Sequence, residues 1–264
     1  MSPNLKIMTK GRKFFVTTPI YYVNDVPHIG HAYATFAADI LARYNRAQGA
    51  DTFFLTGTDE NAQKTVQAAE KSKKDIQEYS DELAKFWADT WKKLGISNDD
   101  FIRTTEERHK KVVLDIFKKI DKRGDIYKGE YKGLYCIGHE AFLKKDDLDE
   151  KGLCPDHKTK PDSIAEKNYF FRLSEYQNKL LNHFERNKDF VQPEERYNEV
   201  VSFIKSGLQD ISVTRETQKW GIAAPNDPNQ VIYVWFDALI NYISANPKKW
   251  PADVHIIGKD ILRF

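Results

Sequence analysis

Residues 14–49 read FFVTTPIYYVNDVPHIGHAYATFAADILARYNRAQG, and this stretch decides the fold. Its start is β-branched and aromatic and is followed by Pro19, which predicts a short buried strand over 14–18. Over 30–48 apolar residues recur at helical spacing, and Gly49 follows where a helix C-cap belongs. The stretch therefore predicts a strand, an irregular turn and a long helix.

The same alternation continues outward along the chain. The pattern predicts strands over 51–56 and around Ile102, and helices over 64–71, 81–94 and 106–122. Strands that alternate with helices are typical of an α/β protein with a parallel sheet and right-handed crossovers. Ligands of such sheets bind beyond the carboxyl ends of the strands, which here means residues 18–31 and 56–61.

The pattern changes near residue 125 and returns near residue 211. Residues 125–170 are rich in Lys, Asp and Gly and contain both cysteines, and we interpret them as part of an inserted domain. Beyond them the sequence predicts helices over 174–187, 194–209 and 237–244, and strands over 231–235 and 254–257. The expected organisation is a flexible N-terminus over 1–12, a first half of the α/β domain over 13–124, an insertion over 125–210 and the start of a second half over 211–264.

Composition excludes several classes of protein. Lys and Arg number 41 against 39 Asp and Glu, for a formal net charge of +2, so any nucleic acid must meet a local basic patch. No run approaches the ~18 apolar residues that a membrane helix needs, and the polar start is not a secretory signal. The 2 cysteines exclude a disulfide scaffold and predict a reducing, cytoplasmic location.

The sequence His28-Ile29-Gly30-His31 lies between the first predicted strand and the long helix. The amino end of a helix offers unpaired N–H groups and partial positive charge, which bind anions. His28 and His31 are three residues apart, so both imidazoles can face one side of the first turn and donate hydrogen bonds to phosphate oxygens. Gly30 allows close approach because it lacks a Cβ. The spacing leaves open two alternatives, which are surface histidines in a loop and a zinc site.

Two Cys-x2-His pairs form a second candidate site. Cys136, His139, Cys154 and His157 are residue types that zinc prefers, and two such pairs with a spacer predict a closed tetrahedral site of structural type. The alternative is a former zinc knuckle that hydrogen bonds now hold together.

Six blocks of sequence resemble the class I aminoacyl-tRNA synthetases, and more narrowly their methionine-specific members. They are Thr17–Asn24 with Pro27–His31, Thr56–Glu60, Phe101–Thr105, Asn168–Leu173, Tyr233–Ala238 and His255–Asp260. The blocks follow the family's order, and the resemblance covers residues 13–264.

The resemblance implies a Rossmann-like parallel sheet with helices on both faces, interrupted by a connective-peptide domain with its zinc knuckle at 136–157. It implies a methionine–tRNA ligase that uses ATP with Mg²⁺ to form methionyl-adenylate and pyrophosphate, and then transfers methionine to the 3′ end of tRNA(Met). The alternatives are another nucleotidylyltransferase with the same helix start and a non-catalytic zinc-bearing tRNA-binding module. Specificity for leucine, isoleucine or valine would be expected to bring a larger editing insertion.

The resemblance also implies roles for individual residues. His28, Gly30 and His31 are the expected catalytic group and contact ATP together with Gly258, Lys259 and Asp260. Asp59, with Glu60 behind it, is expected to bind the ammonium group of methionine with Arg215 as partner, and Asp237 is a weaker alternative for this role. Asp59 could instead cap a helix. The expected lining of the side-chain pocket, whose members could also be ordinary core residues, is Ile20, Tyr22, Trp235, Ala238, Tyr242, Ile261 and Phe264.

The chain departs from the family pattern in two places. Asn61-Ala62 stands where family members often carry His-Gly, which puts any ATP contact of that pair in doubt. The family's Lys-Met-Ser-Lys-Ser loop is absent, and the chain stops at Phe264. From the sequence we therefore expect a catalytic domain truncated before its end, weakly active or inactive alone.

Overall fold

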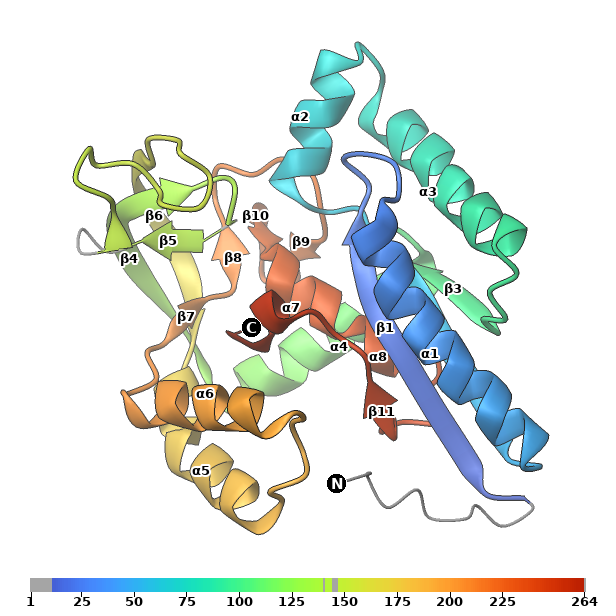
Figure 1. Ribbon diagram of the computed structural model, residues 1–264. Coiled ribbons are helices and arrows are strands. Elements are labelled where there is room, and N and C mark those ends of the chain that lie inside the picture. The colour runs from blue at the N-terminus through green and yellow to red at the C-terminus, as the bar shows by residue number, and fades with distance from the viewer. Residues whose placement is uncertain (1–10, 140, 144–146, 264) are drawn as a thin grey trace. The chain divides into compact units, whose positions relative to one another are not determined.

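The computed structural model describes residues 11–139, 141–143 and 147–263 (Figure 1). The chain forms two compact units, Met1–Val113 with Asp237–Gly258 and Leu114–Phe236 with Lys259–Phe264. Most of the expected flexible N-terminus, residues 1–10, lies outside the described residues, as does Phe264. None of the described helices combines the length and apolar character needed to cross a bilayer.

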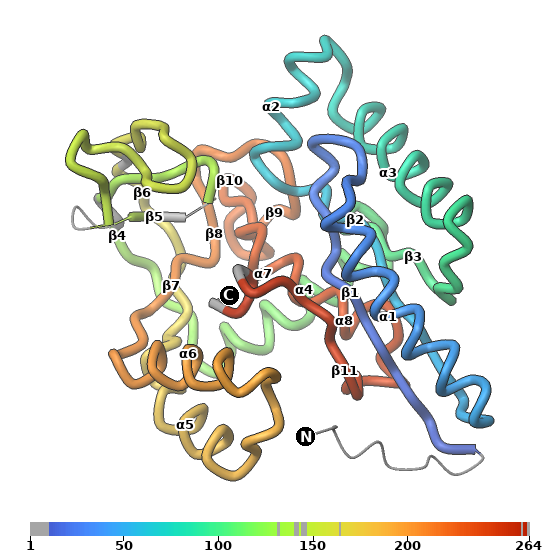
Figure 2. The backbone as a smooth tube through the Cα atoms, viewed as in Figure 1, coloured from blue at the N-terminus to red at the C-terminus, as the bar shows by residue number. Residues whose placement is uncertain are grey.

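The first unit is built on a parallel sheet, as the alternating pattern predicts. Its strands stand in the order β11-β1-β2-β3, and every pairing is parallel. Their bounds are Lys13–Tyr22 for β1, Asp51–Asp59 for β2, Asp100–Arg103 for β3 and Val254–His255 for β11. Figure 2 shows the tube of β1 running beside that of β2.

Helices follow the strands in the expected order. The unit contains α1 (Ile29–Ala47), α2 (Gln63–Lys71), α3 (Ile76–Lys93) and α8 (Asn241–Ser244), while α4 (Glu107–Lys122) and α7 (Val234–Leu239) each run across a boundary between the units. Helix α3 begins earlier than the predicted residue 81, because the Asp75 side chain accepts hydrogen bonds from the N–H groups of Gln77 and Glu78 and caps it there.

The period of two along β1 and β2 sends apolar side chains to both faces of the sheet. Phe14, Val16 and Phe54 share one buried cluster with residues of α1 and α3, including Trp87 and Trp91. On the other face, Phe15, Leu55 and Ile102 form a cluster. Tyr242 of α8 and Ala245, which follows that helix, pack against it. Helical segments therefore cover both faces, as the resemblance implied.

Two predicted strand ends are wrong, and both corrections bear on the site. β1 continues past Thr18 to Tyr22, with its register against β2 shifting between Thr17 and Ile20, so that Pro19, which has no N–H to donate, sits at the irregularity. β2 likewise continues past Thr56 to Asp59. The extended pairing aligns Tyr22 with Asp59 at the carboxyl edge of the sheet.

The second unit contains two antiparallel sheets. One has the order β5-β4-β6-β7, with bounds Ala141–Leu143, Ile126–Cys136, Asp162–Phe171 and Ile211–Ser212. The other has the order β8-β10-β9, with bounds Thr214–Arg215, Asp227–Ile232 and Ala223–Ala224. The remaining elements are α5 (Gln177–Arg186), α6 (Glu194–Lys205) and the 3-10 turns Leu173–Tyr176 and Lys259–Arg263.

Several predicted bounds in the last third of the chain are also corrected. The strand expected over 231–235 ends at Ile232, and Val234 and Trp235 instead begin α7. The helix expected over 194–209 ends at Lys205, because Gly207 adopts a φ of +103° that stops it. The single helix expected over 237–244 is two short helices, α7 and α8, which meet at Ile240.

Candidate functional site

Two histidines cap the start of α1 with their own side chains. His28 is the N-cap, and its Nδ1 accepts a hydrogen bond from the N–H of Gly30 at 3.1 Å. Nδ1 of His31 accepts one from the N–H of His28 at 3.2 Å, and the two rings stack with their centroids 3.6 Å apart. Because each Nδ1 is an acceptor, each neutral ring carries its hydrogen on Nε2. The helix start thus presents two N–H donors besides its backbone groups.

Gly30 leaves room for the His28 ring in the position that caps the helix. A Cβ at Gly30 would lie 2.9 Å from Cε1 of His28. Among the described residues, the group that comes close to this glycine is the His28 ring. The expected close approach of a ligand stays a prediction.

His31 is held as a neutral donor. Burial, and then the charge of His28, lowers the pKa of His31 to about 4. Its ring packs against Tyr21 and Trp87, each with its centroid 4.8 Å away. The imidazole therefore stays uncharged at neutral pH and keeps a fixed direction.

Asp59 lies at the end of β2, where parallel sheets bind ligands. Its side chain is 3% exposed, and Oδ1 accepts a long hydrogen bond of 3.4 Å from the N–H of Asn61. The alternative role as a helix cap is wrong, because the N-cap of α2 is Ala62 and has no side-chain hydrogen bond. Asp59 instead stands next to the half-buried Tyr22 across the strand pair.

The neighbouring carboxylate has a structural role. Glu60 is fully buried and accepts a bidentate pair of hydrogen bonds from Arg103 at 2.7 and 2.9 Å. The hydroxyls of Thr58 and Thr105 donate to it at 2.8 and 2.5 Å. This network joins the ends of β2 and β3 and fixes the backbone that carries Asp59.

Asn61 joins a buried polar group that the sequence did not reveal. Its Nδ2 donates to Oδ2 of Asp237 at 2.6 Å, and Oδ1 of the same carboxylate lies 2.6 Å from Nε2 of His109. Nδ1 of His109 lies 2.8 Å from the Ser244 hydroxyl. A signal was available, because His109 shares a helix face with the buried Val113 and Phe117, and a histidine on a buried face needs a polar partner.

The other residues predicted to line the methionine pocket fall in both units. In the first unit, Ile20 and Tyr242 pack against the Phe15 cluster, burial raises the pKa of Tyr242 to about 12, and Ala238 is buried. In the second unit, Trp235 and Ile261 are half-buried. Tyr22, Trp235 and Ile261 are therefore not fully enclosed core residues.

Arg215 belongs to the second unit, so its expected pairing with Asp59 stays a prediction. Its guanidinium is centred 3.9 Å from the Tyr233 ring, and Nη1 donates to the Ser212 hydroxyl at 2.9 Å. These contacts hold a nearly buried arginine in one orientation.

The segment after β11 is only partly described. Gly258 has no atom within 4 Å of where a Cβ would stand, so nothing among the described residues requires a glycine there. Lys259 is exposed and opens the 3-10 turn Lys259–Arg263. The side chain of Asp260 and all of Phe264 lie outside the described part, and their expected roles stay predictions.

The Cys/His residues of the second unit converge as their spacing predicts. One potential ligand atom from each of Cys136, His139, Cys154 and His157 lies within 4.8 Å of the others. Sulfur-to-nitrogen distances are 3.5 Å from Cys154 to His139, 3.6 Å from Cys154 to His157 and 3.8 Å from Cys136 to His157. Zn–S and Zn–N bond lengths in a tetrahedron place such atoms about 3.6 Å apart. The donor set and its spacing fit a tetrahedral zinc ion.

The surroundings of this cluster favour the same geometry. Nε2 of His139 lies 2.9 Å from Asp156, which leaves Nδ1 to face the sulfur atoms. A Cβ at Gly138 would lie 2.3 Å from the His157 ring, so only glycine fits beneath it. Burial raises the pKa of the Cys136 thiol, against the opposing effect of the backbone N–H groups of His139 and Gly138.

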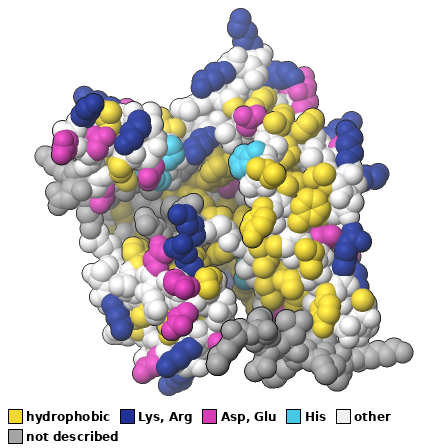
Figure 3. Space-filling view, in the orientation of Figure 1, with side chains coloured by type: hydrophobic (Ala, Val, Ile, Leu, Met, Phe, Trp, Pro, Cys, Tyr) yellow, Lys and Arg dark blue, Asp and Glu magenta, His cyan; other side chains and the backbone are white. Residues whose placement is uncertain are grey.

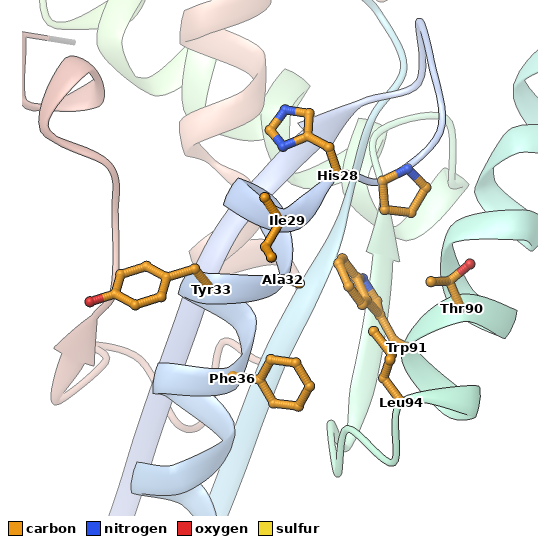
Figure 4. A pocket seen from close by; sticks show the side chains of 9 residues that line it. His28, Ile29, Ala32, Tyr33, Phe36, Thr90, Trp91 and Leu94 are labelled. Carbon is orange, nitrogen blue, oxygen red and sulfur yellow. The ribbon is translucent and has the colours of Figure 1, made fainter.

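An apolar hollow lies beside the helix start but is not the predicted methionine pocket. It measures about 530 Å³ between α1 and the end of α3, and Figure 4 shows His28, Tyr33 and Phe36 on one side and Trp91 and Leu94 on the other. None of the residues predicted to line the methionine pocket lines it. It adjoins an exposed stripe on α1, visible as hydrophobic side chains in Figure 3, that includes Ile29 and Ile40.

A family model described as "tRNA synthetases class I (M)" matches residues 14–162 and 157–264. The chain belongs to this family. The resemblance inferred from the six sequence blocks is thereby confirmed, and the matches do not favour the alternatives of an unrelated nucleotidylyltransferase or a non-catalytic module.

Curated members of the class I tRNA synthetase family are close in sequence. The methionine–tRNA ligase of Thermotoga maritima is 52% identical over 264 residues, which covers 96% of this chain and 42% of the relative. That of Streptomyces coelicolor is 49% identical, with 96% and 50% covered. The chain spans about half the length of the curated relatives it matches.

A solved structure agrees with the fold. Mycobacterium tuberculosis methionyl-tRNA synthetase in complex with methionyl-adenylate superposes with a TM-score of 0.92 at 39% identity, covering 96% of this chain and 52% of the other. The α/β architecture with its parallel sheet is therefore that of the family.

Proposed function

We propose that this chain provides the amino-acid-activating site of a methionine–tRNA ligase. Its relatives carry that name, and a solved neighbour is described with methionyl-adenylate bound. In the proposed reaction, a carboxylate oxygen of L-methionine attacks the α-phosphate of ATP. A new O–P bond forms, and the bond to the pyrophosphate leaving group breaks. The methionyl group then passes to the 3′-terminal ribose of tRNA(Met).

The observation that carries this proposal is the doubly capped start of α1. Nδ1 of His28 and Nδ1 of His31 each accept a backbone hydrogen bond at this helix start, so the neutral form of either ring carries its donor hydrogen on Nε2. Charge on the α-phosphate oxygens builds up during attack, and donors fixed in advance stabilise that charge without rearranging. His28 and His31 supply these donors, and Gly30 permits the ring arrangement.

The methionine is oriented by residues at the carboxyl edge of the sheet. The Asp59 carboxylate, fixed between the Glu60 network and the Asn61 N–H, binds the substrate ammonium group. Tyr22 stands beside it, and an aromatic edge suits a polarizable thioether. Ile20, Trp235, Ala238, Tyr242, Ile261 and Phe264 complete the pocket, Arg215 supports Asp59, and Gly258, Lys259 and Asp260 contact the nucleotide.

Metal ions have separate roles in this proposal. Cys136, His139, Cys154 and His157 hold one zinc ion, which stabilises the inserted domain over 125–210 between the two halves of the catalytic domain, 13–124 and 211–264. With four protein ligands, the zinc leaves no position for substrate. Mg²⁺ accompanies ATP and neutralises charge on the phosphates. The two cysteines form no disulfide with each other, which fits a reducing cytoplasm.

Methionine-dependent exchange of pyrophosphate into ATP tests this function directly. We expect the full-length gene product to exchange with methionine and not with leucine, isoleucine, valine or cysteine. The 264-residue chain itself is tested by calorimetric titration with a non-hydrolysable methionyl-adenylate analogue, which should bind at one site per chain. Exchange that is independent of any amino acid, or that prefers another amino acid, would contradict the assignment.

A further inference from the structure

A chain of four polar side chains crosses the interior of the first unit. It joins Asn61, just beyond β2, to Asp237 on α7, His109 on α4 and Ser244 on α8, through contacts of 2.6, 2.6 and 2.8 Å. None of the four side chains belongs to a residue more than 5% exposed. A buried group of this kind has to be internally satisfied, because water cannot replace a missing partner.

The direction of the hydrogen bonds in this buried series follows from the Asp237 carboxylate at its centre. Asp237 is fully buried, and among the described residues its ion pairs include no lysine or arginine. Its two oxygens each receive one short hydrogen bond, from Nδ2 of Asn61 and Nε2 of His109. The residue at position 61 must therefore donate, and the residue at position 237 must accept.

The same asparagine reaches the substrate side of the sheet. The Asn61 backbone N–H points at Oδ1 of Asp59, and its side chain is tied to α7, on which Ala238 follows Asp237 directly. A change at either end of this connection would shift the Asn61 backbone. Asp59 is nearly buried and has little freedom to readjust.

We propose that Asn61, Asp237 and His109 are positioning residues for the amino acid: their buried hydrogen bonds fix the Asn61 backbone and, through it, the direction of the Asp59 carboxylate. This inference rests on the proposed function, because Asp59 matters for catalysis only if the ammonium group of methionine binds there. Asn61 thus acts toward α7 through its side chain and toward Asp59 through its backbone N–H, which gives a role to the residue that stands in place of the family's histidine.

Reversing the polarity of one hydrogen bond tests this role. Asn61→Asp sets two carboxylates against each other in a buried site, whereas Asn61→Asp combined with Asp237→Asn restores one donor and one acceptor with the same net charge. Asn178→Asp, at an exposed position of α5, is the matched control for the chemical change. Exchange kinetics for methionine and for ATP, and thermal unfolding, are measured on the full-length gene product for each variant.

Asn61→Asp should raise KM for methionine at least about tenfold, since a buried charged hydrogen bond is lost, and leave KM for ATP within about twofold. The double variant should return KM for methionine to within about threefold of the original and recover the melting temperature. Asn61→His, which also donates an N–H, should be tolerated.

Three results would overturn parts of this account, each in a distinguishable way. If the double variant is as impaired as Asn61→Asp in both KM for methionine and melting temperature, the hydrogen-bonded series from Asn61 to Ser244 does not have the proposed donor and acceptor pattern. If the melting temperature recovers but KM for methionine does not, these buried hydrogen bonds stabilise the fold and do not position the substrate. If the original protein shows no methionine-dependent exchange, the proposed function and the Asp59 claim fail together, while the unfolding data still decide the polarity of the chain.

Discussion

Two regions of the molecule gather titratable side chains away from solvent, and they are satisfied in different ways. In the first unit, the Asp237 carboxylate accepts hydrogen bonds from Asn61 and His109, so protein donors match the charge. In the second unit, the ligand atoms of Cys136, His139, Cys154 and His157 crowd within 4.8 Å, the spacing of ligands around a metal ion. The first region is satisfied by the folded chain itself, whereas we propose that the second is completed by a bound zinc ion.

The largest predicted difference between the two regions is in the amount of bound zinc. Cys154→Ser should reduce bound zinc from one ion per chain to none, measured by elemental analysis of protein purified without chelator, because serine is a poor zinc ligand. Asp156→Asn should keep the stoichiometry and weaken zinc binding by about 10–100-fold, since Asp156 only orients His139. Absence of zinc from the unaltered protein would show that this region, too, is closed by hydrogen bonds.

The next largest effect is on catalytic rate, and it concerns the two histidine donors at the start of α1, in the first unit. His31→Ala should lower kcat for exchange by about 100- to 1000-fold, the usual cost of removing one fixed donor to a developing charge. Tyr33→Phe, on the same helix and 78% exposed, is the control and should change kcat less than twofold. A loss below about tenfold for His31→Ala would mean that the backbone N–H groups stabilise the phosphate by themselves.

A smaller effect is expected on stability when one donor of the buried carboxylate is removed. His109→Leu leaves Asp237 with a single donor and should lower the free energy of unfolding by about 3 kcal/mol, measured by urea denaturation. Chelator should not change this loss, since the region contains no metal ligand set among its described residues. A neutral effect would show that Asp237 is already satisfied without His109.

The smallest effect is a change in one titration. Burial is the larger cause of the lowered pKa of His31, and the charge of His28 is the smaller, so His28→Ala should raise this pKa from about 4 but leave it below 6.5. Histidine resonances followed by NMR give both values. With the unfolded pKa at 6.5 and the folded pKa near 4, stability decreases as pH falls from 6.5 toward 4, because only the unfolded chain takes up the proton.

The sequence predicted the parallel sheet, the helix start and the Cys/His cluster because each depends on local spacing. The periodicity over 30–48 and the two Cys-x2-His pairs are readable from neighbours along the chain. Strand ends were predicted too short, because Pro19 is a breaker locally, whereas pairing with β2 carries β1 on to Tyr22. The buried chain through His109 was missed, since its partners are 128 and 135 residues away in sequence.

A crystal structure with a non-hydrolysable methionyl-adenylate analogue tests the central claim most directly. The account predicts that the phosphate or its replacement lies within hydrogen-bond distance of Nε2 of His28 and His31, and that the ammonium group contacts Asp59 with the thioether beside Tyr22. An analogue that binds elsewhere, or an ammonium group held by another carboxylate with Asp59 unoccupied, would contradict it.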